Sequence, residues 1–355
     1  MPSIQSRRAP RLSSFSACRA PLVGLLLAAA MGGAAAQSAP QDWDGVVAAA
    51  KKEGRVVVYS AYVSPDTHQA INKAFEQKYG IKVDILMARG TELRERVRTE
   101  QAAGRYLADV WHTAISNLES GPRDQQFTQP HGGLPNIANL KPDFARRAND
   151  SYAPIFTINY GFLVNSRLVK EGEEPKSWQD LLDPKWKGKI LSDDPRASGG
   201  GRVMFHMTTD KFGKAYHEKL ATQNLVFSRD YQEAIRRVAR GEFAIYIPLI
   251  LSQYEQLRGL PVRYVLPEEG VTYGSYGAPL LKNAPNPNAA RLMADFYLSD
   301  EAQLIYAKTS HGITVKQLSE KLSPEAEALA NVKPLVDEDF TRINAMFDLA
   351  KAIYK

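Results

Sequence analysis

An alternation of strand-like and helix-like segments near the start of the chain constrains the fold most strongly. Residues 55–59 (RVVVY) are rich in β-branched side chains, which is typical of a buried strand. A helix is predicted from Ser64 and Pro65, a cap residue followed by proline, to Gly80. The chain then continues with a predicted strand, helix and strand at 81–85, 92–103 and 107–111. Repeated strand–helix units build a parallel sheet covered by helices, so the sequence predicts an α/β fold.

Polar side chains follow each of these predicted strands. Ligands of open α/β sheets bind beyond the carboxyl ends of the strands. Ser60 and Tyr62 follow the first strand, Arg89 follows the second and Thr113 follows the third. Hydroxyl groups and a guanidinium are suited to hydrogen-bonding an anion. We therefore predict these four residues as ligand contacts, with a core position for Tyr62 and a solvated helix start for Arg89 as the alternatives.

A second α/β pattern follows the proline- and glycine-rich region at 121–154. Segments 156–164 and 262–266 are strand-like, and we expect both to cross between two lobes. Predicted strands at 189–191, 225–227 and 243–247 and a predicted helix at 230–240 form the second unit. Two lobes joined by crossing segments can move about a hinge.

A glycine-rich loop follows the strand at 189–191. Its residues Ser198, Gly199, Gly200 and Gly201 precede a helix that we expect to begin near Arg202. Backbone N–H groups in such a loop, together with a helix N-terminus, can bind a carboxylate or phosphate. A plain strand-to-helix turn is the alternative. Tyr246 and Ser228 occupy comparable positions at other strand ends and complete the predicted site.

The N-terminus has the order of a secretory signal peptide. Four arginines and no acidic residue precede the apolar run at 22–31, and small residues follow at 32–36. Cleavage is expected after Ala36, with the ordinary secretory route preferred to twin-arginine export. The single cysteine, Cys18, lies before the apolar run. The mature chain is therefore expected to be exported, without a thiol or a disulfide.

Charge and histidine spacing narrow the function further. The formal net charge of +6 falls to +2 when the four signal arginines are removed, so a nucleic-acid partner is not expected. The mature histidines have no close metal-ligand spacing, and neither a cofactor nor a resident metal is predicted. Tyr273–Gly277 (YGSYG) contains a formal nucleophile-elbow pattern, but no helix is predicted after it. A serine hydrolase is therefore only an alternative.

Four sequence blocks together resemble one protein family. They are 43–59 (WDGVVAAAKKEGRVVVY), 177–190 (SWQDLLDPKWKGKI), 194–201 (DPRASGGG) and 285–303 (PNPNAARLMADFYLSDEAQ). In this order and spacing they resemble the bacterial extracellular solute-binding proteins related to ferric-ion-binding proteins. The resemblance extends over nearly all of the mature chain.

This resemblance implies a two-lobed type II periplasmic-binding-protein (Venus-flytrap) fold with hinge crossings. Lobe one would comprise 37–155 and 267–311, lobe two would comprise 156–266, and C-terminal helices at 312–355 would pack on lobe one. It implies a monomeric, non-enzymatic protein of the periplasm. Such a protein captures a small ligand for an inner-membrane ABC permease and its ATPase. A sensory binding protein would use the same capture chemistry and is left open.

Ferric iron is the second candidate ligand. Ferric-ion binders of the family usually hold the metal with two adjacent tyrosines, and no two tyrosines are adjacent in this chain. Fe(III) prefers several anionic oxygen donors, which the predicted strand ends do not supply. The preferred ligand is therefore a small organic anion of the carboxylate, phosphonate or phosphate type.

Overall fold

The computed structural model describes residues 42–62, 64–119, 126–337, 339 and 341–355. The predicted signal peptide at 1–36 and the expected start of lobe one at 37–41 lie outside the described residues. Among the residues that are described, no helix combines the length and the hydropathy needed to cross a membrane.

The predicted strand–helix alternation is confirmed in lobe one. Its elements are β1 (Arg55–Ser60), α2 (Pro65–Tyr79), β2 (Lys82–Met87), α3 (Gly90–Ala102) and β3 (Val110–Ala114). β1 lies between β2 and β3 and is parallel to both. The third strand starts later than predicted, because its pairing with β1 begins only at Val110. Just before it, the carboxylate of Asp109 accepts a hydrogen bond from the backbone N–H of Val57 at 2.7 Å.

Shorter elements and helices complete lobe one. They are α1 (Trp43–Glu53), α4 (Ile115–Glu119), β4 (Thr128–Gln129), η1 (Pro135–Asn139), α6 (Pro142–Ala145), β11 (Leu280–Leu281), α10 (Pro287–Phe296) and α11 (Asp300–Lys308). Helix α10 packs on α1, and α11 packs on α2. Their apolar side chains join those of the parallel strands in one buried cluster, which includes Val58, Phe75 and Phe296.

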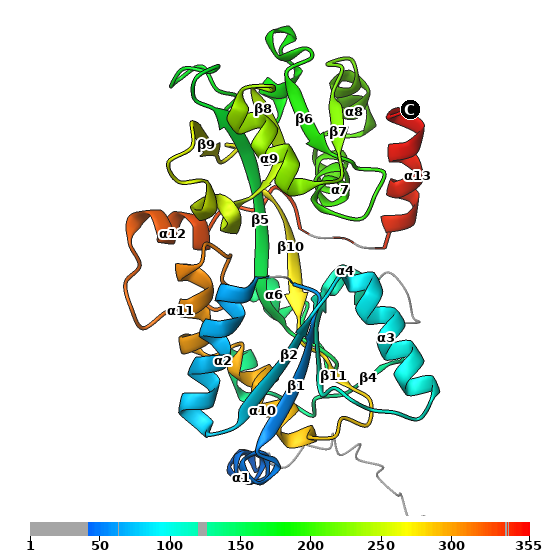
Figure 1. The fold of residues 1–355 in the computed structure, drawn as a ribbon, viewed down its shortest axis with the longest axis vertical. Coiled ribbons are helices and arrows are strands. Elements are labelled where there is room, and N and C mark those ends of the chain that lie inside the picture. The colour runs from blue at the N-terminus through cyan, green and yellow to red at the C-terminus, as the bar shows by residue number, and fades with distance from the viewer. Residues whose placement is uncertain (1–41, 63, 120–125, 338, 340) are drawn as a thin grey trace, which may run out of the picture. The chain divides into compact units, whose positions relative to one another are not determined.

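Two strands connect the lobes (Figure 1). β5 (Pro154–Asn165) is the crossing predicted at 156–164, and every one of its residues is buried. The return crossing is β10 (Thr272–Gly277), which pairs with both β5 and β3. The prediction that 262–266 crosses is wrong, because β9 (Val262–Val265) pairs only with the lobe-two half of β5. The return crossing therefore comes one strand later in the chain.

Lobe two contains the second parallel unit. Its elements are η2 (Gln179–Leu182), η3 (Pro184–Trp186), β6 (Ile190–Asp193), α7 (Gly200–Phe212), α8 (Lys214–Ala221), β7 (Val226–Ser228), α9 (Tyr231–Arg240), β8 (Ile245–Ile250) and η4 (Leu251–Leu257). β6 lies between β7 and β8 and is parallel to both. Phe162 and Trp178 meet edge to face at 4.8 Å in its separate core.

The C-terminal segment divides between the lobes. α12 (Pro324–Ala330) packs on α11 of lobe one, and its Leu329 also joins an apolar cluster with Leu163 and Leu191 of lobe two. α13 (Ile343–Ile353) packs instead on α7 and α8 of lobe two, which differs from the expected placement of all of 312–355 on lobe one. Met346, Ala350 and Tyr354 form an apolar cluster with Phe205, and this burial is the reason for the difference.

Candidate functional site

The carboxyl ends of the strands in each lobe lie side by side, as the parallel order requires. Ser60 is level with Met87 on one neighbouring strand and with His112 on the other. In lobe two Asp193 is level with Ser228. The backbone of Gly200 lies against Tyr160 of β5 and Pro248 of β8. The sequence-predicted residues other than Tyr246 are therefore gathered at two strand edges, one in each lobe, whereas Tyr246 is the second residue of β8 and is level with Leu191.

The four predicted contacts of lobe one differ in their exposure. Ser60 and Thr113 are fully buried, and Tyr62 is only 7% exposed. The Thr113 hydroxyl accepts a hydrogen bond from Asn117 at 3.2 Å. Arg89 precedes the first turn of α3, is exposed, and has no acidic partner among the described residues. In this conformation Arg89 is the member of the set that is available to a ligand.

Buried histidines hold Ser60 and Tyr62 in place. The Ser60 hydroxyl lies 3.0 Å from Nε2 of His68 and 2.8 Å from Nδ1 of His112. The Tyr62 hydroxyl lies 2.5 Å from Nε2 of His311, a residue 249 positions away in the chain. Burial lowers the pKa of His68, lowers that of His112 well below its usual value, and lowers that of His311 to about 3. These rings are neutral at pH 7 and act as hydrogen-bonding groups, not as cations.

The glycine loop of lobe two closes on a carboxylate of the same chain. The backbone N–H of Gly201 donates to Oδ2 of Asp193 at 2.6 Å. Ser198 and Gly199 are exposed, and Gly200 is half-buried. Helix α7 begins at Gly200 without a side-chain cap from the N-cap residue Gly199. One N–H group of the predicted anion cradle is thus already bound by Asp193.

The last two predicted contacts have structural environments. Tyr246 is 1% exposed and its ring meets that of Tyr231 edge to face at 5.8 Å. Ser228 is half-buried, and its hydroxyl exchanges hydrogen bonds with the backbone of Asp230 at the start of α9. Arg202, near which the helix after the loop was expected to begin, lines a small cavity with His206 and Tyr273.

Two polar groups at the end of β8 were missed by the sequence analysis. The hydroxyl of Ser252 and Oε1 of Gln253 are buried without a hydrogen-bond partner among the described residues. Ser252 lies beside the hydroxyl of Tyr62, which belongs to lobe one. Ser252 lies just after a strand, which is the position that led us to predict Ser60 as a contact. This strand was predicted to end at residue 247, whereas β8 ends at Ile250, so Ser252 was not recognised.

Close packing makes one glycine of the loop essential. A Cβ atom on Gly201 would lie 2.5 Å from the backbone oxygen of Asp193, whereas one on Gly274 of β10 would meet nothing within 4 Å. Gly201→Ala is expected to lower the free energy of unfolding by about 1–3 kcal/mol, because backbone atoms cannot move aside cheaply. Gly274→Ala, the control, is expected to change it by less than about 1 kcal/mol. Urea unfolding of both variants measures this, and equal effects would contradict the packing argument.

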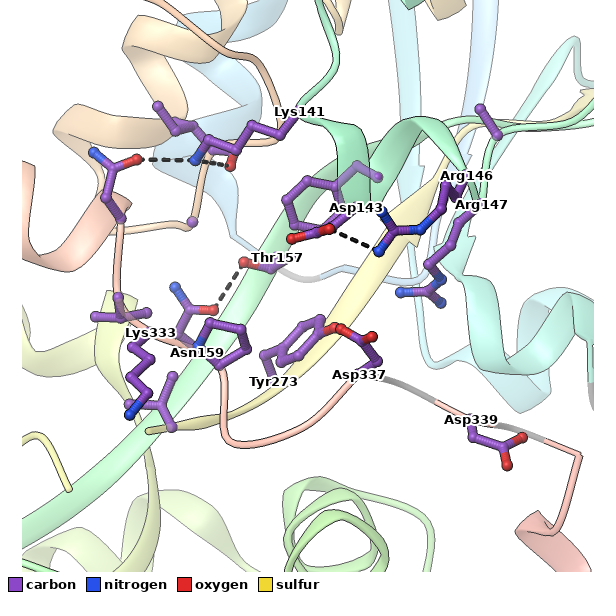
Figure 2. A pocket seen from close by; sticks show the side chains of 18 of the residues that line it. Lys141, Asp143, Arg146, Arg147, Thr157, Asn159, Tyr273, Lys333, Asp337 and Asp339 are labelled. Atoms are coloured by element: carbon purple, nitrogen blue, oxygen red, sulfur yellow. Dashed lines mark hydrogen bonds and ion pairs between the residues drawn. The ribbon is translucent and has the colours of Figure 1, made fainter. Parts of the chain in front are cut away.

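A cavity of about 920 Å³ lies elsewhere (Figure 2). It is formed by the segment 141–152, by residues of β5 and β10, and by the chain after α12; none of the ten predicted site residues lines it. Thr157 and Asn159 face it from β5 and are hydrogen-bonded to each other at 2.8 Å. Because side chains alternate along a strand, Ile158 and Tyr160 point to the opposite face of β5. The cavity is therefore on the other side of this strand from the contact between Tyr160 and Gly200.

The charges around this cavity are balanced. Its lining contains four basic and four acidic side chains, Lys141, Arg146, Arg147, Lys333, Glu119, Asp143, Asp337 and Asp339. Arg146 and Asp143 form an ion pair at 2.7 Å, and Lys141 donates to Asn331 at 2.9 Å. Equal numbers of basic and acidic side chains give this lining no formal net charge that would favour an anion.

The described residues around Ser275 do not have the geometry of a hydrolase. Ser275 lies in the middle of β10, level with Thr157 of β5, and strand β11 follows where a nucleophile elbow requires a helix. No group of three or more histidine, cysteine, aspartate or glutamate side chains with metal-binding geometry is found in the described part of the chain.

Comparisons with known proteins identify the relatives of this chain. The sequence model of a family described as bacterial extracellular solute-binding protein matches residues 119–341. A putative 2-aminoethylphosphonate-binding periplasmic protein of Salmonella typhimurium is 29% identical over 68% of this chain and 72% of its own. The periplasmic binding protein AfuA of Actinobacillus pleuropneumoniae, solved with fructose-6-phosphate, is 26% identical, with a TM-score of 0.65 over 85% of this chain and 96% of its own.

Proteins named for a different ligand also share this fold. The ferric iron-binding protein A of Mannheimia haemolytica, in an open conformation, has a TM-score of 0.70 at 20% identity, over 84% of this chain and 98% of its own. The predicted type II periplasmic-binding-protein fold and the resemblance to ferric-ion-binding proteins are confirmed by these structural matches.

Proposed function

Because this chain belongs to the family of bacterial extracellular solute-binding proteins, we propose that it captures a small organic anion with a phosphonate, phosphate or carboxylate group. It is a non-enzymatic periplasmic solute-binding protein that serves an ABC transporter. The permease and ATPase of that transporter would receive the ligand from the protein, acting as a monomer. The predicted signal peptide, cleaved after Ala36, would deliver it to the periplasm.

The ligand is proposed to bind between the two strand edges, not in the large cavity. The observation that carries this is Arg89, an exposed guanidinium at the end of β2 without an acidic partner among the described residues. A guanidinium binds oxyanions in a bidentate way, and the glycine loop at 198–201 forms the lobe-two side of the proposed site. Tyr62, Ser60 and Thr113 support the lobe-one side of this site.

The relatives support an oxyanion as the ligand. The Salmonella protein is named for a phosphonate, and AfuA was solved with a phosphosugar. Both compounds carry a phosphorus oxyanion, the group that a guanidinium and backbone N–H groups recognise. Iron is supported less well, because the likeness to the ferric-binding protein is one of fold, and no pair of adjacent tyrosines occurs in the sequence.

Ligand-dependent thermal stability tests the ligand class. A compound that binds only the folded protein raises the thermal midpoint by mass action. The panel should contain phosphonates, sugar phosphates, carboxylates and ferric citrate. A rise with oxyanions and none with ferric citrate is the expected result. A rise with ferric citrate alone, accompanied by a tyrosinate-to-iron absorption band, would replace the anion by iron.

A pair of variants tests the location. Arg89→Ala is expected to weaken binding of the identified anion by roughly 10- to 100-fold, since a charge-assisted hydrogen bond contributes about 1.5–3 kcal/mol. Lys333→Ala removes a cation that lines the large cavity and is expected to leave affinity unchanged. Isothermal titration calorimetry measures both. The reverse pattern would move the ligand into the cavity.

A further inference from the structure

Asp193, at the carboxyl end of β6, forms no direct ion pair among the described residues, and the positive charge of Arg229 acts on it only from a longer distance. Its carboxylate is half-buried and accepts two backbone hydrogen bonds, from Gly201 at 2.6 Å and from Asp194 at 3.1 Å. The nearby guanidinium groups of Arg196 and Arg229 both bind the neighbouring Asp194, at 2.8 and 3.0 Å. Burying a carboxylate without an opposite charge is unfavourable, and burial raises the pKa of Asp193.

Three tyrosine side chains belong to the elements next to this carboxylate. The rings of Tyr231 and Tyr246 lie 5.8 Å apart at an angle of 72°. Tyr160 lies against Gly200, and a Cβ atom on that glycine would come within 2.9 Å of the tyrosine ring. A Cβ atom on the adjacent Gly199 would come within 2.9 Å of Oδ2 of Asp193, and Tyr246 is level with Leu191, two residues before Asp193, so the four residues form one group. We call this group the Asp193 cluster.

The remaining capacity of the carboxylate defines what it can bind. An ionised carboxylate has about four acceptor positions, of which the two backbone hydrogen bonds occupy two. Rings of tyrosine attract cations through their faces. A carboxylate bordered by aromatic rings is therefore complementary to an ammonium group and repels a second anion.

We propose that the Asp193 cluster is an ammonium subsite, and that the captured ligand is a zwitterion with an amine at one end and an oxyanion at the other. This inference rests on the proposed function, which supplies the oxyanion end at Arg89. Capture would place opposite charges of one small molecule on opposite lobes, the oxyanion on lobe one and the ammonium on lobe two. A ligand that lacked either charge would bind with lower affinity.

Matched ligand pairs test the subsite in the full mature protein. The pairs are 2-aminoethylphosphonate and ethylphosphonate, phosphoethanolamine and ethyl phosphate, and β-alanine and propionate. The amino member of at least one pair is expected to bind at least tenfold more tightly than its amine-free partner in calorimetry. If the amine-free members bind as well as the amino members, the ammonium subsite is wrong while the anion function stands. If none of the six binds, both proposals fail.

A substitution isolates the charge of Asp193. Asp193→Asn keeps an oxygen for the Gly201 N–H and removes the negative charge. It is expected to weaken the amino ligand by roughly 10- to 100-fold and to leave the amine-free ligand unchanged or tighter. Asp230→Asn makes the same change at the N-cap of α9, where the carboxylate accepts from Glu233, and should alter neither affinity. An unchanged affinity of Asp193→Asn for the amino ligand would overturn the assignment.

Discussion

Acidification from pH 6.5 to 4.5 is expected to lower the free energy of unfolding by roughly 5 kcal/mol through His217 and His311 alone. Burial lowers the pKa of each of these side chains to about 3. The unfolded chain takes up protons below its ordinary histidine pKa of about 6.5, whereas the folded chain does not, so stability is lost as the pH falls from there toward 3. The loss amounts to about 1.4 kcal/mol per pH unit for each histidine.

Buried carboxyl groups oppose this effect, because burial raises the pKa values of Asp109, Asp193 and Asp295. Burial raises the pKa of Asp295 to about 6, so the folded state binds its proton more readily than the unfolded state does. Protonation of Asp295 therefore raises the free energy of unfolding by about 2 kcal/mol when the pH falls from 6.5 to 4.5. His68 and His112, whose pKa values are also lowered by burial, act in the same direction as His217. The net prediction is a loss of stability in mild acid.

A variant separates the histidine contribution from the rest. His217→Gln should flatten the dependence of the unfolding free energy on pH by about 1.4 kcal/mol per unit between pH 6 and 4.5. Urea unfolding at several pH values measures the slope, which is independent of any packing loss at pH 7. Lys219→Gln, at an exposed site on the same helix, should retain the wild-type slope. An unaltered slope in His217→Gln would show that this ring takes up a proton as readily in the folded chain as in the unfolded chain.

Tyr354→Ala is expected to lower the free energy of unfolding by about 3–5 kcal/mol, as for other large aromatic side chains removed from a core. Tyr354 is 5% exposed and follows α13. Its ring packs against that of Phe227 at 5.3 Å, and its hydroxyl lies 2.8 Å from Nδ1 of His217. Removing the ring would leave a cavity and an unpaired imidazole nitrogen between α13 and lobe two.

Two further variants make this result specific. Tyr354→Phe should lose only about 1–2 kcal/mol, the effect of leaving His217 without its partner. Lys351→Ala, at an exposed position of the same helix, should change stability by less than about 0.5 kcal/mol. Chemical denaturation of the three variants measures the series. A Tyr354→Ala protein as stable as the wild type would mean that the C-terminal helix does not dock on α7 and α8.

The strand–helix pattern was readable from the sequence because its signals are local. Residues 55–59 carry β-branched side chains that favour a strand, and Gly80 adopts the left-handed conformation, with φ of 70°, that ends α2. Such features depend on residues a few positions apart. The return crossing was misassigned for the same reason, since 262–266 and 272–277 are both short strand-like segments, and only pairing with β3 distinguishes the second.

The candidate site was predictable in position but not in exposure. Most strand ends were recognised, and Ser60, Arg89 and Thr113 lie at or near them, but Tyr246 is the second residue of β8, because this strand continues to Ile250. Whether each faces a ligand depends on partners distant in sequence, as His311 covers Tyr62 from 249 positions away. The occupation of the glycine loop by Asp193 likewise depends on how β6 and α7 pack, because a carboxylate eight residues before Gly201 can bind it only in that geometry.

The sequence by itself determined the α/β class, the first parallel unit, the outward crossing and the family, because periodicity, caps and the order of short motifs are written in contiguous residues. Tertiary structure alone decided which strand returns to lobe one, where α13 docks, and which polar groups are left without a partner. Those outcomes depend on the balance of burial and hydrogen bonding among side chains that the chain brings together only after it folds. The unpaired carboxylate of Asp193 is visible only at that level.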